Sequence, residues 1–368
     1  MMEQDYFSEI VRLSLGQQYA LSRCPDQNEW DLLYDFAQKQ AIVGFLLAGL
    51  EKLPKDQKPP LLLYLNWYGE AELIKAMNQE MNKMAVKIAR EFSNDGFDCC
   101  ILKGQGNALM YSDPLSRNPG DIDIWMRPRG LAKACKMSDV RAEIIHYVEQ
   151  KYQIASTRYY HIEFKVGQIP VEAHFMPGIM NNPVYNKRLQ RFYRDLQDEQ
   201  CRHWVDMPDG EGRIPVPTYA FNVIFQLSHM MHHFFDEGIG LRQMIDYFYL
   251  LRREETLSAK DDLPQRLNYL GLRKFAGAVM YVMQEVLGLE QEYLIVPADE
   301  RRGQTLLEEI YKGGNFGQFS GLTKHGTGSK YFLKNWRSLQ LVRDYPAEAL
   351  SEPLFRTYHF FWRKKTCN

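Results

Sequence analysis

The sequence contains few cysteines, and their spacing does not suggest a cross-linked or metal-bound scaffold. Its 368 residues include six cysteines, and no two of them form a Cys-x-x-Cys pair. Cys99 and Cys100 stand in a short apolar segment, where cysteine packs as a small hydrophobic residue. Neither a disulfide framework nor a zinc site made of thiolates is therefore expected.

Long hydrophobic runs are also missing. The longest apolar stretch, residues 41–50, is much shorter than the ~20 residues that a membrane-spanning helix needs. The first residues lack the basic start and apolar run that are typical of a signal peptide. We therefore expect a cytoplasmic protein with no membrane span.

A strong charge of either sign is missing as well. The 45 Lys and Arg residues nearly balance the 46 Asp and Glu residues, which leaves a formal net charge of -1. Nucleic acid is therefore not favoured as a partner, because a long nucleic acid calls for an extended basic surface. The length is sufficient for two or three domains.

The sequence has no P-loop motif of the form Gly-x-x-x-x-Gly-Lys-Ser/Thr. A different candidate for phosphate binding is the turn Lys103-Gly104-Gln105-Gly106, which follows an apolar segment predicted to form a strand at residues 97–102. Glycines allow the backbone to approach a ligand closely, and N–H groups at a following helix start can hold phosphate oxygens. We expect this turn to contact phosphates.

A pair of aspartates follows in the segment Asp121-Ile122-Asp123-Ile124, which alternates as a strand does. Residues two apart share a strand face, so the two carboxylates lie together and the two isoleucines face the core. Neighbouring carboxylates repel each other, and a divalent cation such as Mg²⁺ or Mn²⁺ relieves that repulsion. The alternative is an edge strand whose two aspartates face solvent.

Together these features resemble a group of largely uncharacterised bacterial nucleotidyltransferases in the polymerase-beta-type nucleotidyltransferase superfamily. The matching residues are Leu102-Lys103-Gly104, Tyr111, Asp113-Pro114, Arg117 and Asp121-Ile122-Asp123. The close resemblance covers residues 97–175, and a weaker one covers residues 229–246. The turn at Lys103 departs from the Gly-Ser or Gly-Gly of the superfamily, and its distance from Asp121 is somewhat long.

The resemblance implies an enzyme that transfers a nucleoside monophosphate from an NTP, such as ATP, to a hydroxyl acceptor with the help of Mg²⁺ or Mn²⁺. It assigns Glu172 the role of third carboxylate, as a metal ligand or as the general base. Lys103 or Arg117 would neutralise charge on the leaving pyrophosphate, although Arg117 could instead pair with Asp113 or Asp121. The acceptor, a small molecule or a protein, and the oligomeric state are not determined by the sequence.

Two other function classes remain open at this point. One is a non-catalytic binding or regulatory protein, for example an antitoxin-like partner, on the same fold. The other is a small-molecule kinase, which shares the need for a metal but releases a nucleoside diphosphate instead of pyrophosphate.

The expected fold class is α+β. A small mixed-sheet core at residues 93–180 is expected between an N-terminal helical region at residues 1–92 and a C-terminal helical region at residues 181–368. Within the core, residues 154–166 are predicted to form one strand, which turns at Gly167 into a second strand that carries Glu172.

Three histidines cluster on a helix predicted at residues 219–235. His229, His232 and His233 are spaced three and four residues apart, so they lie on one side of the helix. A zinc site would need further ligands, of which Asp236 is the nearest. The alternatives are a structural cluster or a histidine that reaches into the active site.

The next helix begins with Leu241-Arg242-Gln243-Met244-Ile245-Asp246, a pattern that the resembling family shares. One helical turn separates Arg242 from Asp246, so an ion pair within the helix is expected.

Overall fold

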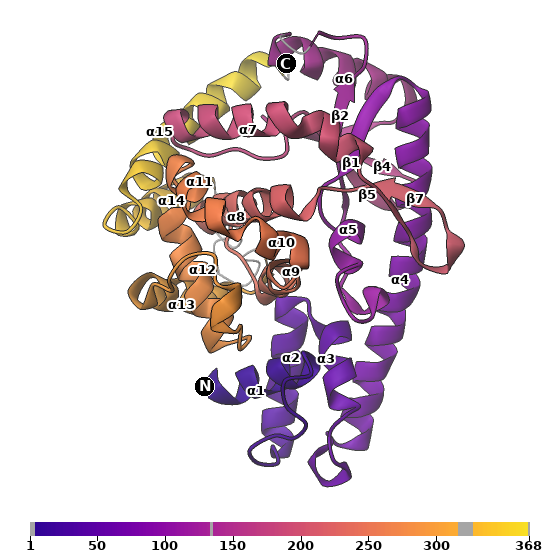
Figure 1. The fold of residues 1–368 in the computed structure, drawn as a ribbon, viewed down its shortest axis with the longest axis vertical. Helices are drawn as coiled ribbons and strands as arrows, with labels where there is room; N and C mark the ends of the chain where they lie inside the picture. The colour runs from indigo at the N-terminus through magenta and orange to yellow at the C-terminus, as the bar shows by residue number, and fades with distance from the viewer. Residues whose placement is uncertain (1–3, 133–134, 316–326, 367–368) are drawn as a thin grey trace.

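The computed structural model describes residues 4–132, 135–315 and 327–366, and the predicted α+β class is confirmed. A mixed sheet lies at one end of the molecule, and most helices gather at the other (Figure 1). The first helical group comprises α1 (Gln4–Ser14), α2 (Gln27–Gln40), α3 (Val43–Leu50) and the long α4 (Leu61–Asn94). Helix α4 runs from the helical end to the sheet and so connects the two parts.

The sheet has five strands in the order β1-β2-β5-β4-β3. Their bounds are β1 (Phe97–Ile101), β2 (Ile122–Pro128), β3 (Ile154–Thr157), β4 (His161–Val166) and β5 (Ile169–His174). Strands β2 and β5 pair in parallel, whereas the other neighbours pair antiparallel. The parallel register sets Asp123 directly opposite Glu172.

The single strand predicted over residues 154–166 is wrong, because β3 and β4 are separate strands. The Arg158 N–H donates to the His161 carbonyl oxygen at 2.8 Å, which closes a tight turn between them. The turn predicted at Gly167 is confirmed, and its φ of 63° suits glycine. The second hairpin brings His161 opposite His174.

Two hydrophobic cores flank the sheet. Ile122 and Ile124 are buried against α4 and α6 (Met137–Lys151), as their alternation predicts. Trp125, on the opposite face of β2, packs in the other core. Cys99 and Cys100 divide between these cores in the same way, as small buried residues.

The C-terminal helices contribute to the core that contains Trp125. They are α7 (Pro183–Arg202), α8 (Tyr219–Asp236), α9 (Leu241–Leu251), α10 (Glu254–Ser258), α11 (Leu263–Tyr269), α12 (Arg273–Glu285), α13 (Glu300–Gly313), α14 (Thr327–Gln340) and α15 (Pro346–Thr366). A hairpin of β6 (Trp204–Asp206) and β7 (Arg213–Pro215) separates α7 from α8. N-terminal residues such as Trp30 and Trp67 share this core with C-terminal residues such as Phe225 and Tyr247.

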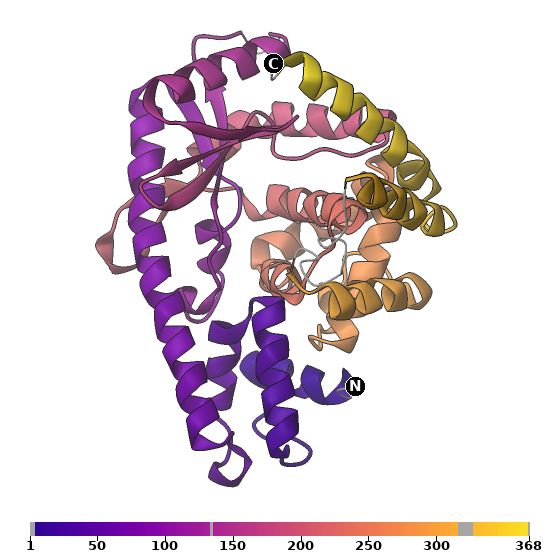
Figure 2. The ribbon, with the colours of Figure 1, turned by 180° about the vertical axis from the view of Figure 1, so that it is seen from behind.

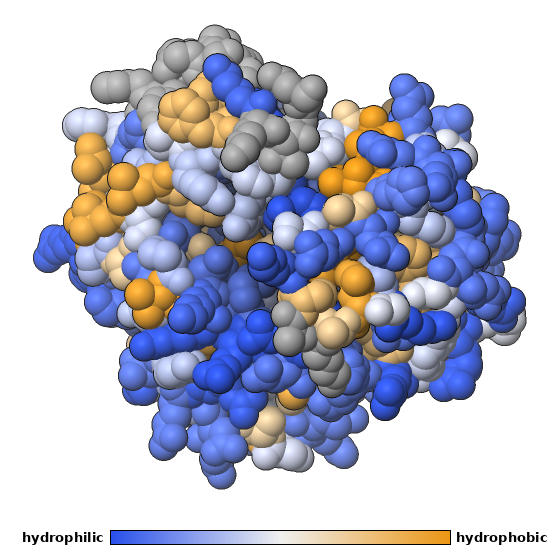
Figure 3. Space-filling view, turned by 90° about the horizontal axis from the view of Figure 1, so that it is seen from above, coloured by the Kyte–Doolittle hydropathy of each residue, from blue (hydrophilic) through white to orange (hydrophobic). Residues whose placement is uncertain are grey.

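The described ranges contain no helix with both the length and the apolar character that crossing a bilayer requires. The face seen in Figure 3 is mainly hydrophilic, with apolar residues in small separate groups. The cytoplasmic setting and the domain boundaries at residues 93 and 181 stay predictions.

Helix α15 is fastened to the start of α7 by one buried carboxylate. Glu348 accepts the N–H groups of Asn181 at 2.8 Å and Asn182 at 3.1 Å, and both ribbon views show α15 beside α7 (Figures 1 and 2). Burial raises the pKa of Glu348 from the usual 4.5 to about 7. Between pH 4.5 and about 7, Glu348 is therefore protonated in the folded protein and ionised in the unfolded chain.

We expect this carboxyl group to make stability fall as the pH rises from about 4.5 to 7. Relative to Glu348→Gln, the wild type should lose up to about 3 kcal/mol of unfolding free energy over that range, because each pKa unit is worth about 1.4 kcal/mol. Urea unfolding of both proteins at several pH values measures the difference. Parallel pH profiles would contradict the prediction.

Candidate active site

Strands β2 and β5 bring the three predicted carboxylates to one place. Asp121 directly precedes β2, Asp123 is the second residue of β2, and Glu172 lies opposite it on β5. Ligand oxygens of the three side chains lie within 4.8 Å of one another. This arrangement follows from the strand alternation and from the parallel register.

The charges of these carboxylates are strongly coupled. Burial and the neighbouring Asp123 raise the pKa of Asp121 to about 7. Burial opposes ionisation of Asp123 too, but the Lys103 ammonium and His174 hold the pKa of Asp123 below its usual value. The set offers only oxygen ligands and carries repulsion that a divalent cation would relieve, so it fits Mg²⁺ or Mn²⁺.

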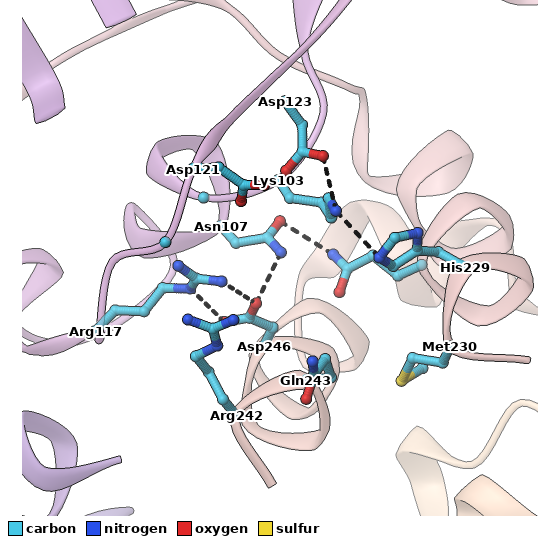
Figure 4. A pocket seen from close by; sticks show the side chains of 13 residues that line it. Lys103, Asn107, Arg117, Asp121, Asp123, His229, Met230, Arg242, Gln243 and Asp246 are labelled. Carbon is cyan, nitrogen blue, oxygen red and sulfur yellow. Dashed lines mark hydrogen bonds and ion pairs between the residues drawn. The ribbon is translucent and has the colours of Figure 1, made fainter. Parts of the chain in front are cut away.

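Lys103 reaches from the end of β1 into the carboxylate cluster. Its Nζ lies 2.9 Å from Asp123 Oδ1 and donates to His229 Nε2 at 3.1 Å (Figure 4). Burial and the Lys103 charge lower the pKa of His229, so the imidazole is neutral and accepts this bond. Gly104 follows with a φ of 55°, which lets the chain turn sharply into α5 (Gln105–Ala108).

The other residues of the predicted phosphate turn make contacts within the protein. The Gln105 side chain is buried and donates to Asn82 on α4 at 2.8 Å. The Gly106 N–H donates to the Lys103 carbonyl oxygen at 3.1 Å, so the turn itself uses this donor. Of the four residues proposed for phosphate contact, only Lys103 and Gly104 line the pocket described below.

Arg117 pairs with neither Asp113 nor Asp121 but with Asp246 on α9. Its Nε donates to Asp246 Oδ1 and its terminal nitrogen to Oδ2, both at 2.8 Å. Tyr111 and Asn107 donate to the same carboxylate at 2.7 and 3.1 Å. Arg117 is thus committed to a buried ion pair, and we no longer assign it to the leaving pyrophosphate.

Arg242 is not the main partner of Asp246, contrary to the prediction within α9. Asp246 takes its bidentate hydrogen bonds from Arg117, and Arg242 donates to the carbonyl oxygens of Asn118 at 3.1 Å and Pro119 at 3.4 Å. Burial and the nearby Arg117 lower the pKa of Arg242 to about 10. Helix α9 therefore fastens the loop that leads from β1 into β2.

A pocket opens between these groups and the helices α8 and α9 (Figure 4). Two carboxylates lie on its sheet side, and basic groups lie on its walls. The lining residues are Lys103, Gly104, Asn107, Arg117, Gly120, Asp121, Asp123, Gln226, His229, Met230, Arg242, Gln243 and Asp246. Its lining sets carboxylates that suit a cation beside basic groups that suit phosphates.

The histidines of α8 do not form the zinc site that their spacing allowed. Among the residues that the structure describes, the groups that could hold an ion combine Asp121, Asp123 and Glu172, or else two histidines of the sheet and Glu172; α8 contributes to neither. His229 instead lines the pocket, which is the third of the roles open to these histidines.

Residues 26–288 match a protein family described as uncharacterised nucleotidyltransferase. The chain belongs to this nucleotidyltransferase family. Among solved structures, an antigenic nucleotidyltransferase-like protein from Paracoccidioides brasiliensis matches with 12% identity and a TM-score of 0.32, over 53% of this chain and 94% of that one. No match was found among curated proteins.

Sequence reasoning missed two histidines of the candidate site. His174 Nε2 lies 3.0 Å from Asp123 Oδ1 and 3.2 Å from Glu172 Oε2, and His161 Nδ1 lies 3.4 Å from the same glutamate oxygen. Although burial works against it, the two carboxylates raise the pKa of His174 to about 9. Strand alternation could have found His174, because it stands two residues after Glu172 on one face.

Proposed function

We propose that this nucleotidyltransferase transfers a nucleoside monophosphate from an NTP to a hydroxyl acceptor, with Mg²⁺ or Mn²⁺ bound by Asp121, Asp123 and Glu172. The observation that carries the proposal is the meeting of these three carboxylates, two of which, Asp121 and Asp123, line a pocket that also contains Lys103 and Arg242. Acidic groups that hold a cation, beside basic groups that hold phosphates, are what nucleotidyl transfer requires.

In the proposed reaction the acceptor oxygen attacks the α-phosphorus, and the bond from that phosphorus to the bridging oxygen breaks. The leaving pyrophosphate takes the electrons of that bond, and the acceptor proton passes to a base. Bound divalent ions supply charge neutralisation at the phosphates and lower the pKa of the attacking hydroxyl. Glu172 stays a candidate for a ligand or for the base.

The basic residues of the pocket have separate tasks in this proposal. Lys103 and Arg242 line the pocket and provide positive charge for the phosphates and for the leaving pyrophosphate. Gly104 has no side chain, so the backbone at this position can approach the phosphates closely. Arg117 acts indirectly, because its bidentate bond to Asp246 fixes the loop that carries Asp121.

The helical side of the pocket is the proposed acceptor site. Gln226, His229, Met230 and Gln243 line it from α8 and α9, opposite the carboxylates. This mixture of amide, imidazole and thioether suits a small molecule or a protein side chain. The nearly neutral charge of the chain also argues against a long nucleic acid as acceptor.

One observation favours the alternative of a non-catalytic binding or regulatory protein. The Lys103 ammonium lies 2.9 Å from Asp123, where it supplies positive charge that a metal ion would otherwise provide. When a metal ion binds to Asp123, the Lys103 ammonium must move away from this carboxylate. In a protein that no longer binds a metal ion, the Lys103–Asp123 ion pair would be permanent.

Calorimetric titration with each NTP in the presence of Mg²⁺ tests the proposal. Wild type is expected to bind one or more NTPs only with the metal, and Asp121→Ala/Asp123→Ala is expected to lose that binding. Asp206→Asn is the matched control, since this carboxylate is 85% exposed on β6. Absence of NTP binding by the folded wild type would favour the binding protein. Release of pyrophosphate identifies a nucleotidyltransferase, and release of a nucleoside diphosphate identifies a kinase.

A further inference from the structure

Two histidines and a glutamate form a compact cluster behind the proposed Mg²⁺ site. His161 lies on β4, and Glu172 and His174 lie on the neighbouring strand β5. His161 Nδ1 lies 3.4 Å from Glu172 Oε2, and His174 Nε2 lies 3.2 Å from that same oxygen. The three ligand atoms lie within 4.8 Å of one another. The histidine side chains are 6% and 1% exposed.

The hydrogen bond on the far side of His161 decides where its proton is. His161 Nε2 lies 3.3 Å from Glu163 Oε1, and a carboxylate can only accept, so Nε2 carries the hydrogen. The Nδ1 lone pair of a neutral ring then faces Glu172. Within the described part of the chain, this buried Nδ1 has no hydrogen-bond partner.

Two acceptors therefore face each other, Nδ1 of the buried His161 and Oε2 of Glu172, whose side chain is 23% exposed. Such a contact is unfavourable unless a cation lies between the two atoms. The further acceptor nearby is Asp123 Oδ1, which lies 3.0 Å from His174 Nε2. The cluster thus has two imidazole nitrogens and one carboxylate oxygen within 4.8 Å of one another.

We propose that His161, His174 and Glu172 bind a divalent transition-metal ion of the Zn²⁺ type. A tetrahedral site with bonds of 2.0–2.1 Å has ligands about 3.3 Å apart, and the two distances here are 3.4 and 3.2 Å. Imidazole ligands select transition-metal ions over Mg²⁺. Glu163 orients His161 from outside, as carboxylates commonly do for histidine ligands of zinc.

This site goes beyond nucleotidyl transfer and is joined to it through Glu172, which belongs to both groups of possible metal ligands. Tyr160 packs over the cluster, with its ring centroid 4.5 Å from His161 and 5.7 Å from His174. An ion enclosed in this way would stay bound while nucleotide and Mg²⁺ exchange in the pocket.

A proton is the competing occupant of the site. In that case His174 is an imidazolium whose Nε2–H is shared between Asp123 and Glu172, and the high pKa of His174 is compatible with this state. The two accounts predict different metal contents, so metal binding separates them.

The test uses the full chain, stripped of metal by a chelator and then dialysed against Zn²⁺ or Co²⁺ with excess Mg²⁺. Wild type is expected to retain one Zn²⁺ per chain by elemental analysis and to give the visible absorption of tetrahedral Co²⁺. His161→Gln should lose this ion, and Glu163→Gln should weaken its binding about 10–100-fold. His146→Gln, an exposed histidine on α6, is the matched control.

The result that overturns the proposal is a folded wild type that retains no Zn²⁺ or Co²⁺, or equal binding by wild type and His161→Gln. If His161→Gln does not fold, Glu163→Gln provides the same comparison. Asp121→Asn separates this site from the proposed function, because Asp121 is not among its ligands. That variant should keep Zn²⁺ and lose Mg²⁺-dependent NTP binding.

Discussion

Asp121→Asn and Asp123→Asn are both expected to lower nucleotidyl transfer by a factor of about 10³ or more, yet to change the stability of the metal-free protein in opposite directions. Both aspartates belong to the proposed metal site, so either variant weakens the charge that holds the cation. The opposite stability effects follow from their different partners in the fold.

Asp121 is surrounded mainly by like charge. Burial and Asp123 raise its pKa to about 7, and Glu172 acts in the same direction. Asparagine has nearly the same shape without the charge, so Asp121→Asn should stabilise the metal-free fold by about 1–3 kcal/mol above pH 7. Such a gain in stability is typical of a functional position, where a charged residue needed for activity destabilises the fold.

Asp123 is the carboxylate that holds the cluster together. Lys103 and His174 both contact its Oδ1, at 2.9 and 3.0 Å. Asp123→Asn leaves these buried groups without their charge partner and should cost about 3 kcal/mol. Urea unfolding in the presence of EDTA measures both variants, and pyrophosphate release measures transfer.

Equal destabilisation by the two variants would contradict this assignment of charges. Retained transfer by either variant would contradict the metal site itself. Asp206→Asn should leave both transfer and stability unchanged, because its side chain is 85% exposed.

The features that the sequence predicted well are those that depend on local periodicity. The alternation of residues 121–124 correctly placed Ile122 and Ile124 in the core, since strand faces follow from spacing alone. The turn at Gly167 was equally local. The register that sets His161 opposite His174 follows from this turn, but it was not among the features predicted from the sequence.

The errors concern contacts between distant segments. Asp246 was expected to pair within its own helix, but its partner Arg117 is 129 residues away in the sequence. The sequence also contained no sign that the Gln105 side chain bonds to α4, which packs beside the turn. Spacing identifies groups that could meet along one element, whereas the choice of partner is made by tertiary packing.

The Arg117–Asp246 pair leads to the second large prediction: Asp246→Asn should destabilise the fold by about 3–5 kcal/mol. The pair is buried, with side chains 7% and 5% exposed, and the bidentate geometry satisfies the guanidinium. Removing the negative charge leaves a buried cation without its counter-charge, which costs far more than a surface pair is worth. Two further donors, Tyr111 and Asn107, would also lose a charged acceptor.

Urea unfolding of Asp246→Asn, with Glu308→Gln as control, tests this assignment. Glu308 also pairs with a basic residue, Lys312, but both side chains are more than 60% exposed, so its loss should change stability by less than about 0.5 kcal/mol. The double variant Arg117→Met/Asp246→Leu should recover part of the loss, because no charge is left unpaired. If the double variant were as unstable as the sum of both single variants, the cost would come from lost packing rather than from the isolated cation. Because the pair fixes the loop that leads into Asp121, Asp246→Asn should also weaken Mg²⁺-dependent NTP binding under conditions where the variant is still folded.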